Sequence, residues 1–314
     1  MIYVIENDYL KAYISEMGAT LTKLIDKKSN TDVVLGFKTD DDYKKSATYV
    51  GASVGRNANR IGNACFELNG KTYNLTVNDN MNQLHGGGLN GFAFKQWKKL
   101  VETKEEIVLG LLSADGEEGF PGNMEVTVSY KLDKNNLIWT YTGESDQDTV
   151  FNMTNHSYFN LGDENILNHE LKIHTKKYSP VDEYSLTKDE IVSVENTPYD
   201  FSDFRVVKDN LDKLGGGIDN NYVWEVMGDK LMAELRYNNL QLNVYSDLPD
   251  MHFYTGAYLT GDNNKNDGSY KAFDGLCLEC QYYPNGINYN SYIKPILKKN
   301  EKMSHYIKYE IKNL

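Results

Sequence analysis

The sequence is short of cysteine, of basic charge and of long apolar runs, and each shortage excludes a class of protein. Its 314 residues include 3 cysteines, an odd number and too few for a disulfide framework. Asp and Glu outnumber Lys and Arg by 45 to 33, and the formal net charge of −12 repels nucleic acids and anionic membranes. We therefore expect a small neutral ligand as partner, with no nucleic acid and no membrane.

No stretch of the chain approaches the roughly 18 consecutive apolar residues that a membrane-spanning helix requires. The opening segment MIYVIENDYLKAYI has no basic leader, apolar core or small-residue cleavage site, which predicts a cytoplasmic protein. Apolar residues make up 40% of the chain and Tyr supplies 24 positions, enough to bury a sizeable core. Because the sequence contains no linker, repeat or low-complexity segment, we predict a single domain over 1–314.

Apolar and polar residues alternate with a period of two along most of the chain, which is typical of β-strands. Residues 65–75 form two alternating runs joined by Asn69-Gly70, the strongest short-range signal for a hairpin. Residues 124–141 and 231–244 repeat the pattern around other turn residues. We predict an all-β fold, a large antiparallel β-sandwich with few short helices. Helical spacing is confined to two short segments, 40–45 and 207–214.

Three short motifs suggest chemistry that their context does not support. The GxSxG string at 51–55 and the HGGG string at 85–88 occur in serine hydrolases, but here no helical pattern follows the first, and their order is reversed. Cys277 and Cys280 have CxxC spacing, yet in a strand their side chains point to opposite faces. The six histidines form no HxH or HExxH pair. We expect buried thiols and no metal.

Arginine and histidine supply the first candidates for a ligand site. Only four Arg accompany 29 Lys, and Arg56 and Arg60 lie together in a segment rich in Gly and Asn. Their planar guanidinium groups suit sugar hydroxyls, a carboxylate or a structural ion pair, and the residues alone leave these open. His85 and His156 lie in loop-like segments beside Gly or Asn, where a side chain can approach a ligand closely. The other histidines are expected to be structural: His169, His174, His252 and His305.

Glu279 is the one charged residue in an otherwise uncharged predicted strand, 275–281. It shares a face with Cys277 and Gln281, because side chains alternate along a strand. Burial of a carboxylate raises its pKa toward the range useful for proton transfer, unless an ion-pair partner compensates the charge. The residues alone leave a catalytic group and a buried structural ion pair as alternatives.

Eight short segments follow one another along the chain in an informative order. They are GRNANRIGNACFELNGKTYNL, NQLHGG, EEGFPG, NMTNHSYFNL, YSPVDEYSLTKDEIVSVENTPYDF, GGIDNNYVW, DLPDMHFYTGAYL and LCLECQYYPNGIN. Together they resemble the aldose 1-epimerases, the galactose mutarotase family, over nearly the whole chain. Each segment alone has low specificity, whereas eight in order are specific. The resemblance implies the galactose mutarotase-like supersandwich and an isomerase that interconverts the α and β anomers of a free aldose.

At matching positions, the resemblance implies Glu279 as general base and His156 as general acid. His85 would be the second active-site histidine, near the ring oxygen of the sugar. A carboxylate close to His156 would raise its pKa and keep it protonated, which predicts a bell-shaped pH profile. The family chemistry needs no cofactor and no metal. The sugar hydroxyls would be held by Arg60, Asn59, Asp219 and Gln281.

The chain departs from the family pattern at several positions. Cys280 stands where Thr or Pro is usual, Asn285-Gly286 replaces an Asp-Ala or Asp-Ser pair, and residues 294–311 lack a Pro-Gly turn. We expect these changes to affect specificity more than the acid and the base. Tyr254 and Phe92 are candidates for the floor of the sugar cleft, with a place in the core as the alternative.

Three other functions remain open at this point. They are a non-catalytic carbohydrate-binding β-sandwich, a glycoside hydrolase, and an epimerase of a phosphorylated hexose. A hydrolase needs two carboxylates, and pairing Asp219 with Glu279 would leave both candidate histidines without a role. A phosphate needs a cluster of cations that two arginines alone do not supply. We expect a monomer or a homodimer.

Overall fold

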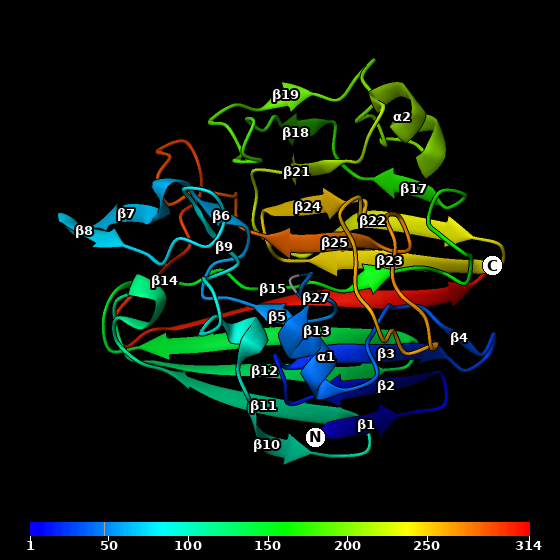
Figure 1. Ribbon diagram of the computed structural model, residues 1–314, viewed down its shortest axis with the longest axis horizontal. Coiled ribbons are helices and arrows are strands. Elements are labelled where there is room, and N and C mark those ends of the chain that lie inside the picture. The colour runs from blue at the N-terminus through cyan, green and yellow to red at the C-terminus, as the bar shows by residue number, and fades with distance from the viewer. Residues whose placement is uncertain (47) are drawn as a thin grey trace.

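The computed structural model describes residues 1–46 and 48–314, and β-strands form most of its regular structure (Figure 1). Within these residues the α-helices are α1 (Asp40–Lys45) and α2 (Val207–Leu214), at the two segments where the sequence predicts them. None of the helices described is long and apolar enough to cross a membrane. The prediction of an all-β fold with few short helices is confirmed.

The largest sheet has nine antiparallel strands, and β27 lies in its middle between β13 and β23. This strand joins two groups of strands that come from distant parts of the sequence. Across the sheet the order is β10 (Lys98–Glu102), β11 (Glu106–Ser113), β12 (Met124–Asp133), β13 (Asn136–Ser145), β27 (Lys302–Asn313), β23 (Leu240–Ser246), β22 (Lys230–Tyr237), β17 (Glu170–Ile173) and β20 (Arg205–Val206).

Two smaller antiparallel sheets complete the layers. A four-stranded sheet consists of β1 (Ile2–Glu6), β2 (Leu10–Ser15), β3 (Thr20–Asp26) and β4 (Thr31–Asp32). A six-stranded sheet has the order β16 (Tyr158–Phe159), β25 (Leu276–Gln281), β24 (Asp250–Tyr254), β21 (Asp219–Val223), β18 (Lys177–Ser179) and β19 (Val192–Ser193).

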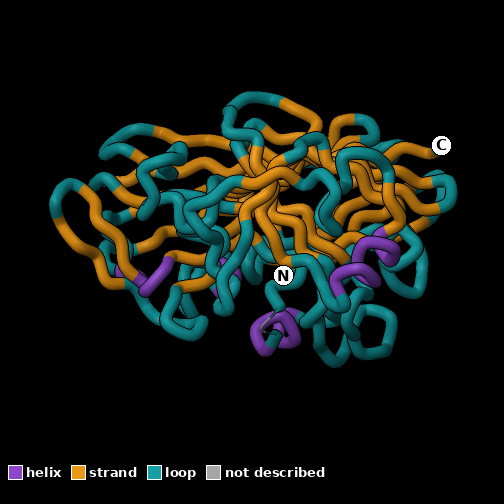
Figure 2. The backbone as a smooth tube through the Cα atoms, turned by 90° about the horizontal axis from the view of Figure 1, so that it is seen from above, coloured by secondary structure: helices purple, strands orange, loops and turns teal. Residues whose placement is uncertain are grey.

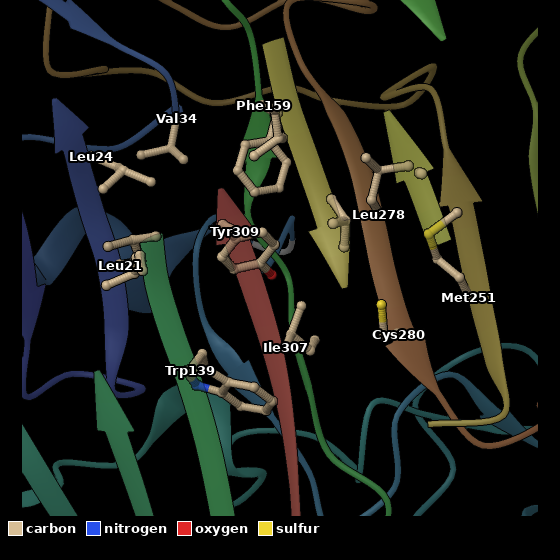
Figure 3. Close-up of a cluster of buried hydrophobic side chains, with 14 of the residues drawn as sticks. Leu21, Leu24, Val34, Trp139, Phe159, Met251, Leu278, Cys280, Ile307 and Tyr309 are labelled. Atoms are coloured by element: carbon tan, nitrogen blue, oxygen red, sulfur yellow. The ribbon is translucent and has the colours of Figure 1, made fainter. Parts of the chain in front are cut away.

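The main hydrophobic core contains side chains from all three of these sheets. Leu21 of β3, Trp139 of β13, Ile307 of β27 and Leu278 of β25 belong to one buried cluster and gather in the same region (Figure 3). Complete burial of such a side chain contributes roughly 1.5–3 kcal/mol. At right angles to the first view, the strands run through the middle of the molecule and the helical segments lie along one side (Figure 2). Sheets packed around a shared core are the predicted β-sandwich.

The three hairpins expected from the alternating pattern are all present. β7 (Cys65–Leu68) and β8 (Lys71–Asn74) are joined by Asn69 and Gly70, whose φ angles are 54° and 75°. These positive values are what a type I′ turn requires of both central residues. The other two hairpins join β12 to β13 and β22 to β23.

Short strand pairs carry loop residues to the six-stranded sheet. β5 (Ser53–Val54) pairs with β15 (Thr154–Asn155), and β6 (Arg60–Ile61) pairs with β9 (Gln83–Leu84). Arg60 lies in β6 itself, and the loops next to these pairs contain Arg56, His85 and His156. The remaining short elements are β14 (Thr149–Val150), which pairs with β26 (Ile296–Leu297), and 3-10 turns at Gly62–Ala64, Phe92–Phe94 and Glu117–Gly119.

Residues of β24 and β25 alternate between two environments. Met251 and Leu278 point into the main core (Figure 3), whereas their neighbours His252 and Glu279 pair across the ladder and line a pocket. The cysteines of β25 divide in the same way: Cys280 belongs to the main core and Cys277 to a separate cluster. Both are buried free thiols, as the sequence predicts.

Candidate active site

A pocket with about 590 Å³ of empty space, open to solvent, lies where the loops meet the six-stranded sheet. It contains six of the seven residues that the sequence analysis expects to act on a sugar; Gln281 is not among them. Aromatic rings, imidazoles and carboxylates line one concave site, a composition that suits a polar ligand with apolar faces. The lining residues are Thr48, Tyr49, Asn59, Arg60, Leu84, His85, His156, Tyr158, Asp219, His252, Tyr254, Tyr258 and Glu279.

Glu279 is a buried carboxyl group, with 2% of its surface exposed. Burial raises its pKa well above the usual value, the negative charge of Asp219 raises it further, and Arg60 opposes both. Its Oε2 atom has no hydrogen-bond partner among the described residues. The side chain therefore has a free oxygen and a proton affinity suited to acid–base chemistry.

His156 faces Glu279 across 3.7 Å, measured from Nε2 to Oε1. Its backbone is fixed at both ends, because its N–H donates to the Ala52 carbonyl and its own carbonyl accepts from the Gly51 N–H. Burial lowers the pKa of His156 to about 4, although a hydrogen bond to its own backbone opposes this shift. The sequence analysis expects the opposite direction, and that expectation is wrong because the loss of hydration outweighs the negative charge of Asp219.

His85 and Asn59 hold each other through two hydrogen bonds. The backbone N–H of His85 donates to the backbone carbonyl of Asn59 at 3.1 Å, and the backbone N–H of Asn59 donates to the ring nitrogen Nδ1 of His85 at 3.2 Å. Nδ1 therefore carries no proton, and a neutral His85 has its N–H at Nε2. Burial, followed by the positive charge of His156, lowers the pKa of His85 well below its usual value. His85 is thus a neutral donor to the pocket.

The glycine after His85 has a packing role that explains the HGGG string. A Cβ atom on Gly86 would lie 2.0 Å from the Gly55 carbonyl oxygen, and the residue has φ of +80°. Any larger side chain would push the His85 loop away from the segment that contains Arg56. The string therefore marks a close approach of two backbones.

Asp219 is held by a histidine that the sequence analysis assigns to the structural class. His252 Nε2 lies 2.6 Å from Asp219 Oδ1. Burial acts to raise the pKa of Asp219, but the hydrogen bond and charge of His252, together with Arg60, outweigh it and hold the pKa below its usual value. Asp219 is therefore an ionised acceptor.

The two arginines separate into a structural and a pocket residue. Arg56 is 2% exposed and donates to the hydroxyl and carbonyl of Ser113 and to the carbonyls of Pro121 and Gly122, so it binds the surrounding loops together. Arg60 uses Nε to bind Asp79 at 2.7 Å. Its position in the pocket lining leaves the rest of the guanidinium group available to a ligand.

A profile of the aldose 1-epimerase family matches residues 1–310. The chain belongs to the aldose 1-epimerase family. It is 36% identical to galactose mutarotase of Bos taurus, over 96% of this chain and 91% of the relative. It is 33% identical to aldose 1-epimerase of Escherichia coli K12, over 95% of this chain and 90% of the relative.

Solved structures of this family share the same fold. A GalM/aldose epimerase homologue from C. elegans matches with a TM-score of 0.94 and 28% identity, over 100% of this chain and 99% of the other. Galactose 1-epimerase from Lactobacillus acidophilus matches with a TM-score of 0.87 and 28% identity, over 99% of this chain and 93% of the other. The chain is an isomerase of the aldose 1-epimerase family, an enzyme that interconverts the anomers of an aldose.

The structure places Gln281 and Phe92 outside the lining of the pocket. Gln281 lies two residues beyond Glu279 on β25, roughly 6.6 Å along the strand, opposite Asp250 and outside the pocket lining. Phe92 is buried against Trp97, with ring centroids 5.8 Å apart, so it is a core residue. Tyr254 does line the pocket.

Two of the departures from the family pattern lie outside the pocket lining. Cys280 points into the main core. Asn285 accepts a hydrogen bond from the Gly62 N–H and donates its own N–H to the Arg60 carbonyl, so it supports the backbone beside Arg60. Neither residue is part of the pocket lining.

His85, His156 and Glu279 each place one ligand atom within 4.8 Å of the others, the donor set of a two-histidine, one-carboxylate metal site. A histidine bound to a metal donates its second ring N–H to an acceptor. If Nε2 of His85 bound a metal, the ring hydrogen would be on Nδ1. The group that faces Nδ1 is the backbone N–H of Asn59, which is also a donor and cannot accept this hydrogen. The site fits the oxygens of a sugar better than a metal ion.

Proposed function

We propose that the chain interconverts the anomers of a free galactose- or glucose-type aldose, with Glu279 as general base and His156 as general acid. The observation that carries the proposal is the 3.7 Å separation of His156 Nε2 and Glu279 Oε1 in an open pocket. A donor and an acceptor this close can reach the ring oxygen and the anomeric hydroxyl together, because both oxygens are bonded to C1. The names of the relatives, galactose mutarotase and galactose 1-epimerase, support galactose as a substrate.

Ring opening requires two proton transfers and one bond cleavage. Glu279 takes the proton of the anomeric hydroxyl, His156 gives a proton to the ring oxygen, and the bond from C1 to the ring oxygen breaks as the C1 carbonyl forms. The aldehyde then turns about the bond from C1 to C2, and the reverse transfers close the ring on the other face. Both side chains return to their first protonation state, so the cycle consumes nothing.

The pair of Glu279 and His156 carries one proton throughout this cycle. When the closed sugar is bound and ready to react, Glu279 is a carboxylate and His156 is an imidazolium. When the open-chain aldehyde is bound, Glu279 is a carboxylic acid and His156 is a neutral imidazole. Burial favours the second arrangement, because it raises the pKa of Glu279 and lowers the pKa of His156. The pocket therefore stabilises the intermediate relative to the closed sugar, which speeds ring opening.

The other pocket residues would bind and orient the sugar. His85 would donate its Nε2 hydrogen to a sugar oxygen near the ring, because its Nδ1 already accepts from the Asn59 N–H. Asp219 would accept from a hydroxyl, with His252 holding it in place at 2.6 Å. Arg60 and Asn59 would supply further hydrogen bonds, and Tyr254 an aromatic surface for the apolar face of the sugar.

A phosphorylated hexose is a less suitable substrate. Among the described residues that line the pocket, Arg60 is the one Lys or Arg, and Asp79 already neutralises it at 2.7 Å. Asp219 and Glu279 add carboxyl groups that would repel a phosphate dianion. Family membership removes the glycoside hydrolase and the non-catalytic sandwich from consideration.

Polarimetry tests the proposed function. Freshly dissolved α-D-galactose, α-D-glucose and D-galactose 6-phosphate are each followed to rotational equilibrium with and without the protein. We expect faster equilibration of the free sugars and no comparable effect on the phosphate. Rates equal to the spontaneous ones for both free sugars would contradict the proposal. A cytoplasmic location and a monomeric or homodimeric state are part of the proposal, and sedimentation analysis tests the second.

A further inference from the structure

Both ring nitrogens of His156 face side chains of strand β25. Cys277 Sγ lies 3.5 Å from Nδ1, and Glu279 Oε1 lies 3.7 Å from Nε2. Cys277 and Glu279 are two residues apart on one face of the strand, so a single short stretch of backbone sets both contacts. All three side chains are buried, with exposed fractions of 5% for His156, 0% for Cys277 and 2% for Glu279.

Stacking alone does not determine how the imidazole is oriented. Tyr49 and Tyr158 both contact the ring, with centroid distances of 5.9 and 5.2 Å. Aromatic faces fix the plane of an imidazole, but they make the same contacts after the ring is turned over in that plane. The choice of the nitrogen that points at Glu279, and of the nitrogen that carries the proton, therefore depends on contacts at the edges of the ring.

Cys277 supplies a side-chain contact at the Nδ1 edge without adding a charge, in addition to the hydrogen bond that His156 makes to its own backbone. Burial raises the pKa of the Cys277 thiol well above its usual value, so the group stays neutral at physiological pH. A carboxylate in this place would stabilise the imidazolium and raise the pKa of His156, and thus oppose the transfer of its proton to the sugar. A thiol can fix the ring and leave the proton mobile.

We propose that Cys277 is a positioning residue for the anomer interconversion: its Sγ accepts the Nδ1 hydrogen of His156 and keeps Nε2 directed at Glu279 and the sugar. The mechanistic part of this inference rests on the proposed function. The titratable groups that face His156 or act on it from neighbouring elements are Tyr49, His85, Tyr158, Asp219, His252, Cys277 and Glu279.

The first test compares Cys277→Ala with Cys277→Ser and with a matched control, Cys280→Ala. Cys280 is an equally buried thiol of the same strand, but it points into the main core. Nitrogen-15 NMR of the imidazole reports which nitrogen of His156 carries the proton. We expect the wild type, Cys277→Ser and Cys280→Ala to hold the proton on Nδ1, and Cys277→Ala to show a mixture of both tautomers.

Polarimetric kinetics of the same proteins supply the second readout. We expect Cys277→Ala to lower kcat about 10-fold with little change in KM, the usual cost of losing a group that orients an active-site histidine. Cys277→Ser should recover most of kcat, and Cys280→Ala should retain it. A wild-type tautomer and kcat in Cys277→Ala would overturn the proposal, as would an equal loss of kcat in Cys280→Ala.

Cys277→Asp gives a measurement in the opposite direction. A carboxylate against Nδ1 should raise the pKa of His156 and move the acid limb of kcat/KM to higher pH by about one unit or more. If the acid limb of folded Cys277→Asp were unchanged, the proposal that residue 277 contacts Nδ1 of His156 would be overturned. The NMR readout does not depend on activity, so a tautomer change without any epimerase activity would contradict the proposed function and leave the Cys277 contact supported.

Discussion

The two faces of the six-stranded sheet are built from the same strands but have opposite chemistry. On one face, Met251, Phe253 and Leu278 are fully buried in the main core. On the other, Glu279 Oε2 and His252 Nδ1 are buried without a hydrogen-bond partner among the described residues. An unsatisfied buried polar group costs about 1–3 kcal/mol. One face therefore stabilises the fold, and the other lowers its stability and provides the reactive site.

The largest effect is expected from the reactive face, at Glu279. Glu279→Gln keeps the shape of the side chain and removes its ability to take a proton, so kcat should fall by roughly 10² to 10⁴. Polarimetry with α-D-galactose measures the change, and circular dichroism confirms that the variant is folded. Activity within a few-fold of the wild type would show that the sheet supplies no essential base.

His156→Asn should lower kcat by a similar factor, roughly 10² to 10⁴, because asparagine cannot exchange a proton with the ring oxygen. The matched control is His169→Asn, because His169 is an equally buried histidine whose Nε2 accepts from the Leu161 N–H outside the pocket. The folded fraction of His169→Asn should have the kcat of the wild type. Equal loss of kcat in both variants would point to a general structural effect.

The core face should respond in stability. Leu278→Ala removes a side chain with no exposed surface, so the free energy of unfolding should fall by about 2–5 kcal/mol. The folded protein should keep its KM, because Leu278 points away from the pocket. Urea unfolding and polarimetry at low temperature measure the two quantities. A raised KM with unchanged stability would mean that the two faces are not independent.

The pH profile of kcat/KM tests whether Glu279 and His156 together hold one proton in the active enzyme. Below about pH 4, the lowered pKa of His156, both groups are protonated and no base remains. Above the raised pKa of Glu279 neither group holds a proton, and no acid remains. The acid limb should therefore lie near pH 4, and the alkaline limb well above the usual Glu range, as values of the coupled pair. An acid limb near pH 6.5 would contradict the desolvation of His156.

The smallest effect is a gain in stability from Glu279→Gln. Because the folded-state pKa of Glu279 is raised, its contribution to stability is full below about pH 4.5 and is lost as pH rises. Glutamine does not ionise, so the variant should be more stable by about 1 kcal/mol at neutral pH. The difference in Tm should grow between pH 5 and pH 8. A difference that shrinks over this range would mean that Glu279 ionises normally in the folded protein.

The alternating pattern predicted the β-fold and its hairpins, whereas most of the pocket residues and their roles were implied by the family resemblance. Asn69-Gly70 marked a hairpin, and Glu279 stood out as the charge in an uncharged strand. His252 was missed although the same signal was present, since it alternates with the apolar Met251 and Phe253. Recognising it required the register that sets it opposite Glu279.

Other properties of the site depend on packing that a sequence does not specify. Gln281 shares the face of Glu279, and where the pocket ends along that face is decided by distant loops. Phe92 and Tyr254 are both aromatic residues, and only tertiary contacts separate the core ring from the pocket ring. The pKa of His156 is lowered because the folded chain buries the ring, and the extent of this burial is not visible in the sequence.

The position of β27 determines when the largest sheet can be completed during synthesis. β13 pairs with β12 on one side, but its other edge waits for β27, which is translated much later. At typical rates of about 5–20 residues per second, that edge stays open for on the order of ten seconds. An open strand edge is a template for pairing with other chains, so the nascent polypeptide should be most vulnerable to aggregation in this interval.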